Sequence, residues 1–308
     1  MSTALPTPAF MRADAWRAFV LASCLCLGLS ACSPRQMVIG GVADELAHAG
    51  LAAEPDLALA RDAAPFYLKL SESMLLRQPG HVGLATSVSA GFTQYAYAFV
   101  AFEADRVEAQ DAQAASRLRQ RAAALYARAT RHALAALESR HPAFRTRLQD
   151  ADPERWPTLR ADEIGLAYWA SAAWGSWIAL AKDAPEVVAD LPLAVRLAEW
   201  AARRDANWGK GALASLRGTF EASRPGGDRR QAVQHFAQAI ALADGCCAGP
   251  FVSRAEALAL PAGDRAAFEA DLRQALAVTV DPDSPDALQN EVMRRRAAWL
   301  LEQAPDLF

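Results

Sequence analysis

The sequence predicts an all-α protein, and three observations carry this prediction. Alanine, leucine, arginine and glutamate, all strong helix formers, dominate the chain after residue 40. Apolar residues recur at spacings of three and four, which is the period of an amphipathic helix, and no segment alternates as a strand does. Helix-breaking residues recur at short intervals. We therefore expect helical hairpins packed as one compact bundle or solenoid over residues 32–308.

The first 31 residues have the composition of a lipoprotein signal peptide. Arg12 and Arg17 supply the positive start, and residues 18–29 form the apolar run. The run ends in Leu29-Ser30-Ala31-Cys32, where small residues suit a signal peptidase and the thiol would take the lipid. This pattern predicts a signal over residues 1–31, cut before Cys32. An ordinary secretory signal that contains cysteines is the alternative.

Lipidation at Cys32 would place the mature protein in the periplasm, anchored to a membrane through its acyl chains. Each buried methylene contributes roughly 0.8 kcal/mol, so several chains hold a protein firmly. Ser33 follows the cysteine, and the lack of Asp at that position favours the outer membrane over the inner one.

Charge and cysteine usage exclude two classes of protein. The chain has 32 basic and 35 acidic residues, so the net charge of −3 argues against nucleic acid as a partner. Cys24 and Cys26 leave with the signal, and only Cys246 and Cys247 remain beyond the lipidated one. Adjacent cysteines close only a strained ring, which excludes a disulfide framework and leaves an oxidised vicinal pair open.

Proline and glycine divide the chain into roughly ten expected helices joined by short loops. The expected boundaries are Pro65, Pro79-Gly80, His141-Pro142, Asp152-Pro153, Trp156-Pro157, Pro185, Pro192, Pro225-Gly226-Gly227, Gly249-Pro250, Pro261-Ala262-Gly263 and Pro282.

A weak internal repeat accompanies these boundaries. The pattern of alanine, aromatic and alanine at spacings of four and three occurs twice, and a variant with alanine in the middle lies between them. The three sets are Ala122, Tyr126 and Ala129; Ala232, Phe236 and Ala239; and Ala194, Ala198 and Ala201. Tetratricopeptide repeats use such residues where two helices cross closely. The spacing between the sets is irregular, so we expect degenerate tetratricopeptide-like hairpins, with an unrelated helical bundle as the alternative.

Two segments, residues 84–102 and 164–181, contain no charged residue. A helix that is apolar all round must be buried on every side, so we expect these to be central helices wrapped by amphipathic ones. Membrane spans are the alternative because the lengths would permit them. Serine, threonine and glutamine within the segments, and the lack of basic clusters at their ends, argue against spans.

No motif for catalysis or metal binding is present. The five histidines are scattered, and none has a carboxylate or cysteine at the spacing of metal ligands. The chain has no G-x-S-x-G motif and no glycine loop that would cradle a phosphate. We therefore expect no enzyme activity, no metal site and no cofactor.

The aromatic residues of the two charge-free segments are the candidate ligand site. Most of these rings are expected to be core, but an apolar cleft with a few polar groups is the usual composition of a small-molecule site. The candidates for such a cleft are Gln94, Tyr95, Tyr97, Trp169, Trp174 and Trp177.

Six stretches of the chain form a further pattern: Pro65-Phe66-Tyr67-Leu68-Lys69-Leu70, residues 92–100 (FTQYAYAFV), Trp174-Gly175-Ser176-Trp177-Ile178, Gly211-Ala212-Leu213, Pro225-Gly226-Gly227-Asp228 and residues 294–301 (RRRAAWLL). Together they resemble the T-component family of TRAP transporters, also called TatT. The resemblance covers nearly all of the mature chain. The Gly245-Cys246-Cys247-Ala248-Gly249 turn has no counterpart in the family pattern.

The resemblance implies a periplasmic lipoprotein of tetratricopeptide-like helices with a hydrophobic cleft and a tendency to trimerise. It further implies an accessory role toward the substrate-binding P component, with transfer of a hydrophobic or amphipathic organic molecule. A tetratricopeptide scaffold lipoprotein for outer-membrane or cell-wall assembly is the alternative function.

Overall fold

The computed structural model describes residues 43–47, 54, 56–150, 152–156, 158–279 and 281–308. Residues 43–308 form one compact unit. The expected signal peptide and Cys32 lie outside the described residues, so cleavage and lipidation stay predictions.

The described residues form helices and no strand, which confirms the all-α prediction. In chain order the α-helices are α3 (Leu57–Leu75), α4 (Val82–Tyr95), α5 (Phe102–Val107), α6 (Ala112–Arg140), α7 (Phe144–Gln149), α8 (Ile164–Leu180), α9 (Pro185–Val188), α10 (Leu191–Arg204), α11 (Ala212–Ser223), α12 (Arg229–Ala243), α13 (Gly249–Arg254), α14 (Arg265–Ala277) and α15 (Ala287–Leu307). Two π-helical turns, η3 (Ala96–Ala101) and η6 (Ala255–Ala259), continue α4 and α13, and two 3₁₀ turns, η4 (Pro153–Arg155) and η5 (Ala161–Glu163), precede α8.

Most of the expected boundaries fall between helices or at their first turns, but Pro65 does not. Pro65 lies inside α3. Its side chain is exposed, so the carbonyl group that loses its helical hydrogen bond can bond to water instead. Pro305 is likewise inside α15.

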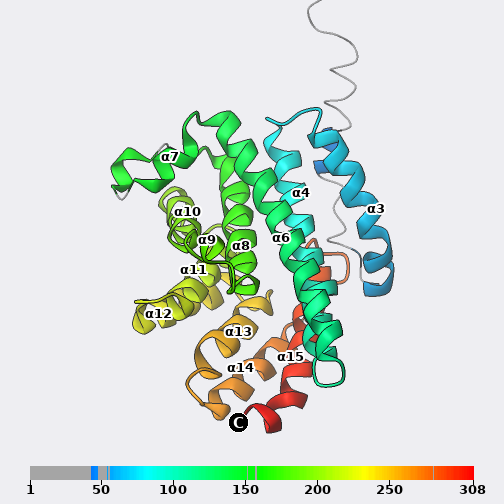
Figure 1. Ribbon diagram of the computed structural model, residues 1–308. Coiled ribbons are helices and arrows are strands. Elements are labelled where there is room, and N and C mark those ends of the chain that lie inside the picture. Colours follow the sequence, from blue (N-terminus) through cyan, green and yellow to red (C-terminus); the bar gives the residue numbers. More distant parts are fainter. Residues whose placement is uncertain (1–42, 48–53, 55, 151, 157, 280) are drawn as a thin grey trace, which may run out of the picture. The chain divides into compact units, whose positions relative to one another are not determined.

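The two charge-free segments become α4 with η3 and α8, and they lie at the centre of the bundle. Helix α8 packs against α4, α6 and α10, while α4 also packs against α3 (Figure 1). Leu84, Val88, Leu166 and Ala170 have no exposed surface. The central position is as predicted, yet burial on every side was wrong, because Gln94 on α4 is exposed.

All three sets of repeat residues are buried. The alanines of α6, α10 and α12 in these sets have no exposed surface, and Phe236 is fully buried. A Cβ on Gly218 of α11 would lie 3.1 Å from the Phe236 ring, so the glycine leaves room for the aromatic residue of α12. Small and aromatic residues therefore allow the close crossing expected from the pattern. The tetratricopeptide likeness itself stays a prediction.

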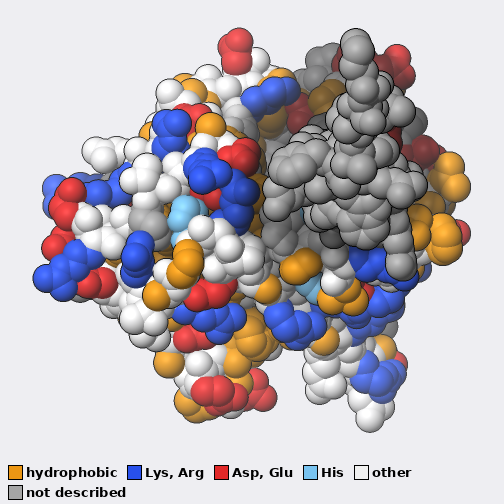
Figure 2. All heavy atoms as spheres, turned by 90° about the horizontal axis from the view of Figure 1, so that it is seen from above, with side chains coloured by type: hydrophobic (Ala, Val, Ile, Leu, Met, Phe, Trp, Pro, Cys, Tyr) orange, Lys and Arg blue, Asp and Glu red, His pale blue; other side chains and the backbone are white. Residues whose placement is uncertain are grey.

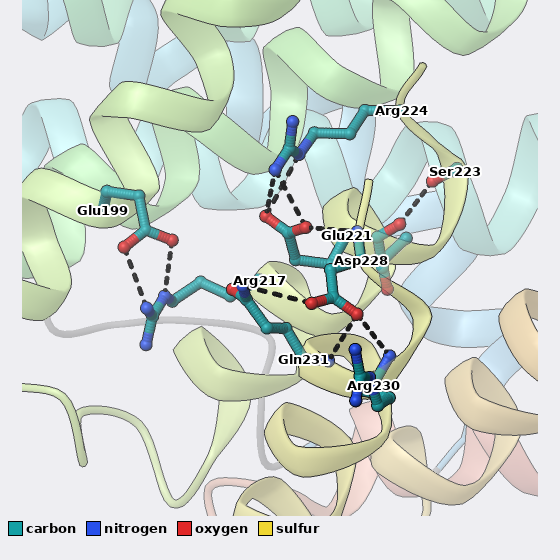
Figure 3. Close-up of polar contacts among 9 residues, drawn as sticks. Glu199, Arg217, Glu221, Ser223, Arg224, Asp228, Arg230 and Gln231 are labelled. Atoms are coloured by element: carbon teal, nitrogen blue, oxygen red, sulfur yellow. Dashed lines mark hydrogen bonds and ion pairs between the residues drawn. The ribbon is translucent and has the colours of Figure 1, made fainter. Parts of the chain in front are cut away.

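The turn between α11 and α12 is ordered by one buried carboxylate. Glu221 accepts hydrogen bonds from Arg224, at 2.7 Å and 2.9 Å, and from the backbone N–H of Asp228 at 3.0 Å (Figure 3). A Cβ on Gly227 would lie 2.1 Å from the Glu221 carbonyl oxygen, so only glycine fits there. Arg217 of α11 also donates two hydrogen bonds, of 2.7 Å and 2.8 Å, to Glu199 of α10. These contacts connect the successive helices α10, α11 and α12.

Acidic and basic side chains are interspersed on the face seen in Figure 2. On that face no charge of one sign dominates, which agrees with the small net charge of −3.

Candidate functional site

A cavity of about 560 Å³ opens beside the charge-free helices. Its walls come from α3, from α4 with η3, from α8 and from the start of α15. The residues that line it are Ala47, Ala60, Ala64, Tyr67, Leu68, Gly83, Thr86, Ser87, Ala90, Gly91, Thr93, Gln94, Tyr95, Tyr97, Ala98, Phe99, Tyr126, Asp162, Tyr168, Trp169, Ala172, Ser176, Pro285, Leu288, Gln289, Val292 and Met293. Ligand cavities in proteins commonly have volumes of about 300 to 1,000 Å³, so this one can hold a small organic molecule.

Helix α4 presents a stripe of small and polar side chains to the cavity. Thr86, Ala90 and Gln94 follow one another at intervals of four, which keeps them on one face of the helix. The π-helical turn η3 comes next, and its i to i+5 bond runs from the N–H of Phe102 to the carbonyl of Tyr97. Such a turn contains an extra residue, and π-helical turns are frequent at functional sites. Tyr97 and Phe99 of this turn reach the lining beside Tyr95 of α4.

The cavity wall is almost free of charge. Asp162 is the one carboxylate among the lining residues; its side chain is 60% exposed and 3.7 Å from Arg140. Burial raises the pKa of Tyr168 to about 12, and burial with the nearby Glu256 carboxylate raises the pKa of Tyr97 well above its ordinary value. Both phenols therefore stay neutral at any physiological pH. The arrangement suits an apolar ligand with few polar groups.

A second cavity, of about 340 Å³, lies between α8, α11, α13 and the start of α15. Tyr168, Trp169, Gln289 and Met293 line both cavities, so these four side chains separate the two spaces. The second cavity differs from the first in its ionisable lining, because Lys210, Cys247 and Asp286 all face it.

The structure brings together four of the six predicted cleft residues. Gln94, Tyr95, Tyr97 and Trp169 line the first cavity, whereas Trp174 and Trp177 do not line either one. The reason is helical geometry: Trp169, Ala172 and Ser176 share one face of α8, at spacings of three and four. Trp174 is instead 5% exposed in the core, and Trp177 packs against the core.

Several lining residues could not be predicted from a local sequence pattern. Tyr67 belongs to the aromatic stretch of α3, and its hydroxyl donates to the Leu46 carbonyl. Met293 comes from α15, where its sulfur lies 3.7 Å from the Tyr97 hydroxyl. No local pattern could have shown that α15 reaches α4.

Buried ion pairs hold together the helices that form the walls of the first cavity. Glu72 of α3 accepts hydrogen bonds from Lys69, Arg128 and His132. Burial alone would raise the pKa of Glu72, but these hydrogen bonds outweigh it and lower the pKa to about 2. The carboxylate is fully engaged as a link between α3 and α6.

Arg296 of α15 is the corresponding link on the other side of the first cavity. It lies 2.6 Å from both Asp105 and Glu256. Its guanidinium group also lies 5.1 Å from the ring centres of Phe102 and Trp299. This geometry ties α15 to α5 and η6 and suits structure better than catalysis.

The comparison with known families identifies the chain. The model of the TRAP transporter T-component family matches residues 53–308. The chain belongs to this family. The T-component family is an accessory family of transporters and not a family of enzymes, which agrees with the absence of a catalytic motif from the sequence.

A relative of this T component occurs in Treponema pallidum (strain Nichols). It is 27% identical over 262 residues, which cover 83% of this chain and 81% of the relative, and it is described as an uncharacterized protein. The similarity therefore extends over most of both chains but adds no functional detail.

None of the helices that the structure describes in this T component is both long and apolar enough to cross a membrane. Neither charge-free helix therefore qualifies as a span.

Proposed function

We propose that this T component encloses an apolar organic ligand in the first cavity and passes it to the substrate-binding P component of a TRAP transporter. One observation carries the ligand part: a cavity of about 560 Å³ whose wall is aromatic, small and nearly uncharged. Burying apolar surface there contributes about 25 cal/mol for each Å² that leaves water.

The lining also limits the chemistry of the ligand. Among the residues that the structure describes, the lining includes no lysine or arginine, and burying an unpaired carboxylate is costly. An organic acid would therefore place its hydrocarbon part inside and keep its charged group in water. The amides of Gln94 and Gln289 supply polar contacts for a neutral group.

A cavity-filling variant tests ligand binding. Ala172 lines the cavity on α8, and Ala179 is exposed on the same helix. We expect Ala172→Phe to lose the small molecule that gently purified wild-type protein retains in native mass spectrometry, and Ala179→Phe to keep it. Equal retention in both variants, or no bound molecule in the wild type, would contradict a ligand role for this cavity.

Docking to the P component is tested separately. Tagged T component is expected to copurify the P component of its own transporter from the periplasm, and the Ala172→Phe variant should copurify it equally. Copurification of outer-membrane or cell-wall assembly proteins in its place would favour the scaffold alternative.

The membrane anchor follows from the sequence pattern at Cys32. We expect Cys32→Ser to release the protein into the soluble periplasmic fraction, whereas Cys26→Ser, within the signal, should leave it on the outer membrane. If the Cys32→Ser variant is found in the membrane fraction to the same extent as the wild type, lipidation at this residue is contradicted.

An exposed apolar stripe on α3 supports self-association, and the resemblance to the T-component family implies that the assembly is a trimer. Leu59, Phe66 and Leu70 are 54%, 76% and 42% exposed, and their spacings of seven and four place them on one face. Phe66→Glu is expected to yield monomers in analytical ultracentrifugation. Leu76→Glu, at an equally exposed residue just after the helix, should leave trimers intact.

A further inference from the structure

The turn after α12 holds two adjacent thiols in a fixed place. Asp244 and Gly245 have φ angles of 46° and 77°, which reverse the chain at the end of the helix. The buried Asn290 of α15 then clamps the turn, because its amide donates to the Cys246 carbonyl at 2.8 Å and accepts from the Ala248 N–H at 2.9 Å. Cys246 and Cys247 are thereby positioned by a helix that is distant in sequence.

The same helix supplies a third potential ligand. Asp286 precedes the first turn of α15, and one of its carboxylate oxygens lies within 4.8 Å of both sulfur atoms. The two sulfur atoms are 2.9 Å apart. Cys247 and Asp286 also line the second cavity. Two sulfur atoms and a carboxylate oxygen, converging at a cavity wall, are the ligand set of an open zinc-type site.

The charge at this cluster fits a divalent cation. Two thiolates and one carboxylate carry a charge of about −3 together, and a divalent cation leaves about −1. The Lys210 ammonium group, 2.5 Å from Asp286, neutralises the remainder. The sequence predicts no metal site, since Asp286 reaches the two cysteines only through tertiary packing. We propose that Cys246, Cys247 and Asp286 nevertheless bind a thiophilic divalent cation of the zinc class, with the fourth coordination position open to the second cavity.

A vicinal disulfide is the competing use of the same thiols. It would require the sulfur atoms to approach to about 2.05 Å within a strained ring. In tetrahedral zinc coordination the sulfur atoms, each about 2.3 Å from the metal, stand further apart, and a small side-chain rotation achieves this. A disulfide would leave Asp286 paired with Lys210 alone, although the carboxylate lies within 4.8 Å of both sulfur atoms. The carboxylate therefore favours the cation.

Cobalt provides a spectroscopic test, because tetrahedral thiolate coordination of Co²⁺ gives intense charge-transfer and visible absorption. Reduced, chelator-treated full-length T component is titrated with Co²⁺ and then with Zn²⁺. We expect one Co²⁺ per chain with thiolate bands, which Zn²⁺ abolishes by displacement. Cys246→Ser with Cys247→Ser should lose the bands, and Asp286→Asn should weaken Co²⁺ binding by about tenfold or more.

Asp283→Asn is the matched control, since Asp283 is an exposed carboxylate of the same loop. It should bind Co²⁺ as the wild type does, and circular dichroism checks that every variant is folded. Wild-type protein without thiolate bands would overturn the proposal. So would unchanged Co²⁺ binding by Asp286→Asn, or periplasmic protein that carries a Cys246–Cys247 disulfide and no metal in mass spectrometry. Retention of the ligand in the first cavity is measured in parallel, so failure here leaves the proposed function standing.

Discussion

The two cavities share a wall of four side chains and differ in almost everything else. The first is built from long helices, and apart from the exposed Asp162 carboxylate its polar groups are neutral hydroxyls and amides. The second is built largely from helix ends and turns, and it contains a lysine, a cysteine and an aspartate. Apolar enclosure and ionic chemistry are thus kept in neighbouring but separate spaces of one bundle.

The walls of the two cavities are also stabilised by different contacts. The first cavity needs rigid helices around an empty space, and buried ion pairs at Glu72 and Arg296 hold them. The second needs two turns held at a fixed distance, and the amide of Asn290 does this. Removing one of the ion pairs should therefore affect the first cavity alone, and removing the Asn290 amide should affect the second cavity alone.

The largest effect is expected from Glu72→Gln. The substitution leaves Arg128 and His132 without their buried carboxylate, and breaking a buried ion pair lowers the free energy of unfolding by about 3 kcal/mol. Urea denaturation measures this. Glu108→Gln removes an exposed partner of Arg119 and should cost about 1 kcal/mol or less. Similar losses of unfolding free energy in the two variants would show that the buried ion pairs of Glu72 stabilise the fold no more than an exposed pair does.

The same cluster predicts a pH dependence. The pKa of Glu72 falls from 4.5 to about 2 on folding. A lowered pKa gives stability that is fully present above pH 4.5 and is lost as the pH falls toward 2. The difference in unfolding free energy between wild type and Glu72→Gln should therefore shrink over this interval. A constant difference in denaturation experiments at successive pH values would rule out this linkage.

Asn290→Ala should have a smaller and more local effect. It leaves the Ala248 N–H and the Cys246 carbonyl without partners in a buried place, which costs about 2 kcal/mol. Hydrogen exchange should quicken in the turn before α13, while ligand retention in the first cavity stays at the wild-type level. Asn207→Ala, at an exposed residue, serves as the control. Faster exchange throughout α4 would show that the two walls are not independent.

The fold was largely predictable from local sequence features. Charge-free segments predicted the central α4 and α8, and proline and glycine predicted most helix ends. Pro65 was misleading because a proline ring on an exposed helix face breaks one hydrogen bond without ending the helix. Expected boundaries also enclose α7, and α13 with η6, but boundaries alone do not say how much of such a short block is helical.

The candidate site was predictable only in part, for a geometric reason. Composition indicated that the aromatic residues mattered, but a list of rings does not say which face of a helix meets a cavity. The π-helical turn contributes Tyr97 and Phe99 to the lining beside Tyr95 of α4, and no sequence pattern predicted this turn. Asp286 and Met293 come from α15 and join the sites only through tertiary packing.

The smallest effect, and the sharpest distinction between lining and core, is expected at Trp174. Its indole N–H is buried without a hydrogen-bond partner, so Trp174→Phe relieves that cost while it loses some packing. The two changes oppose each other, and the free energy of unfolding should fall by no more than about 1 kcal/mol. Ligand retention should be unchanged, whereas Trp169→Phe, which alters a ring on the wall of both cavities, should reduce it. If native mass spectrometry shows equal loss of ligand from the two variants, the apolar site extends into what is now described as core, and the boundary between them has to be redrawn.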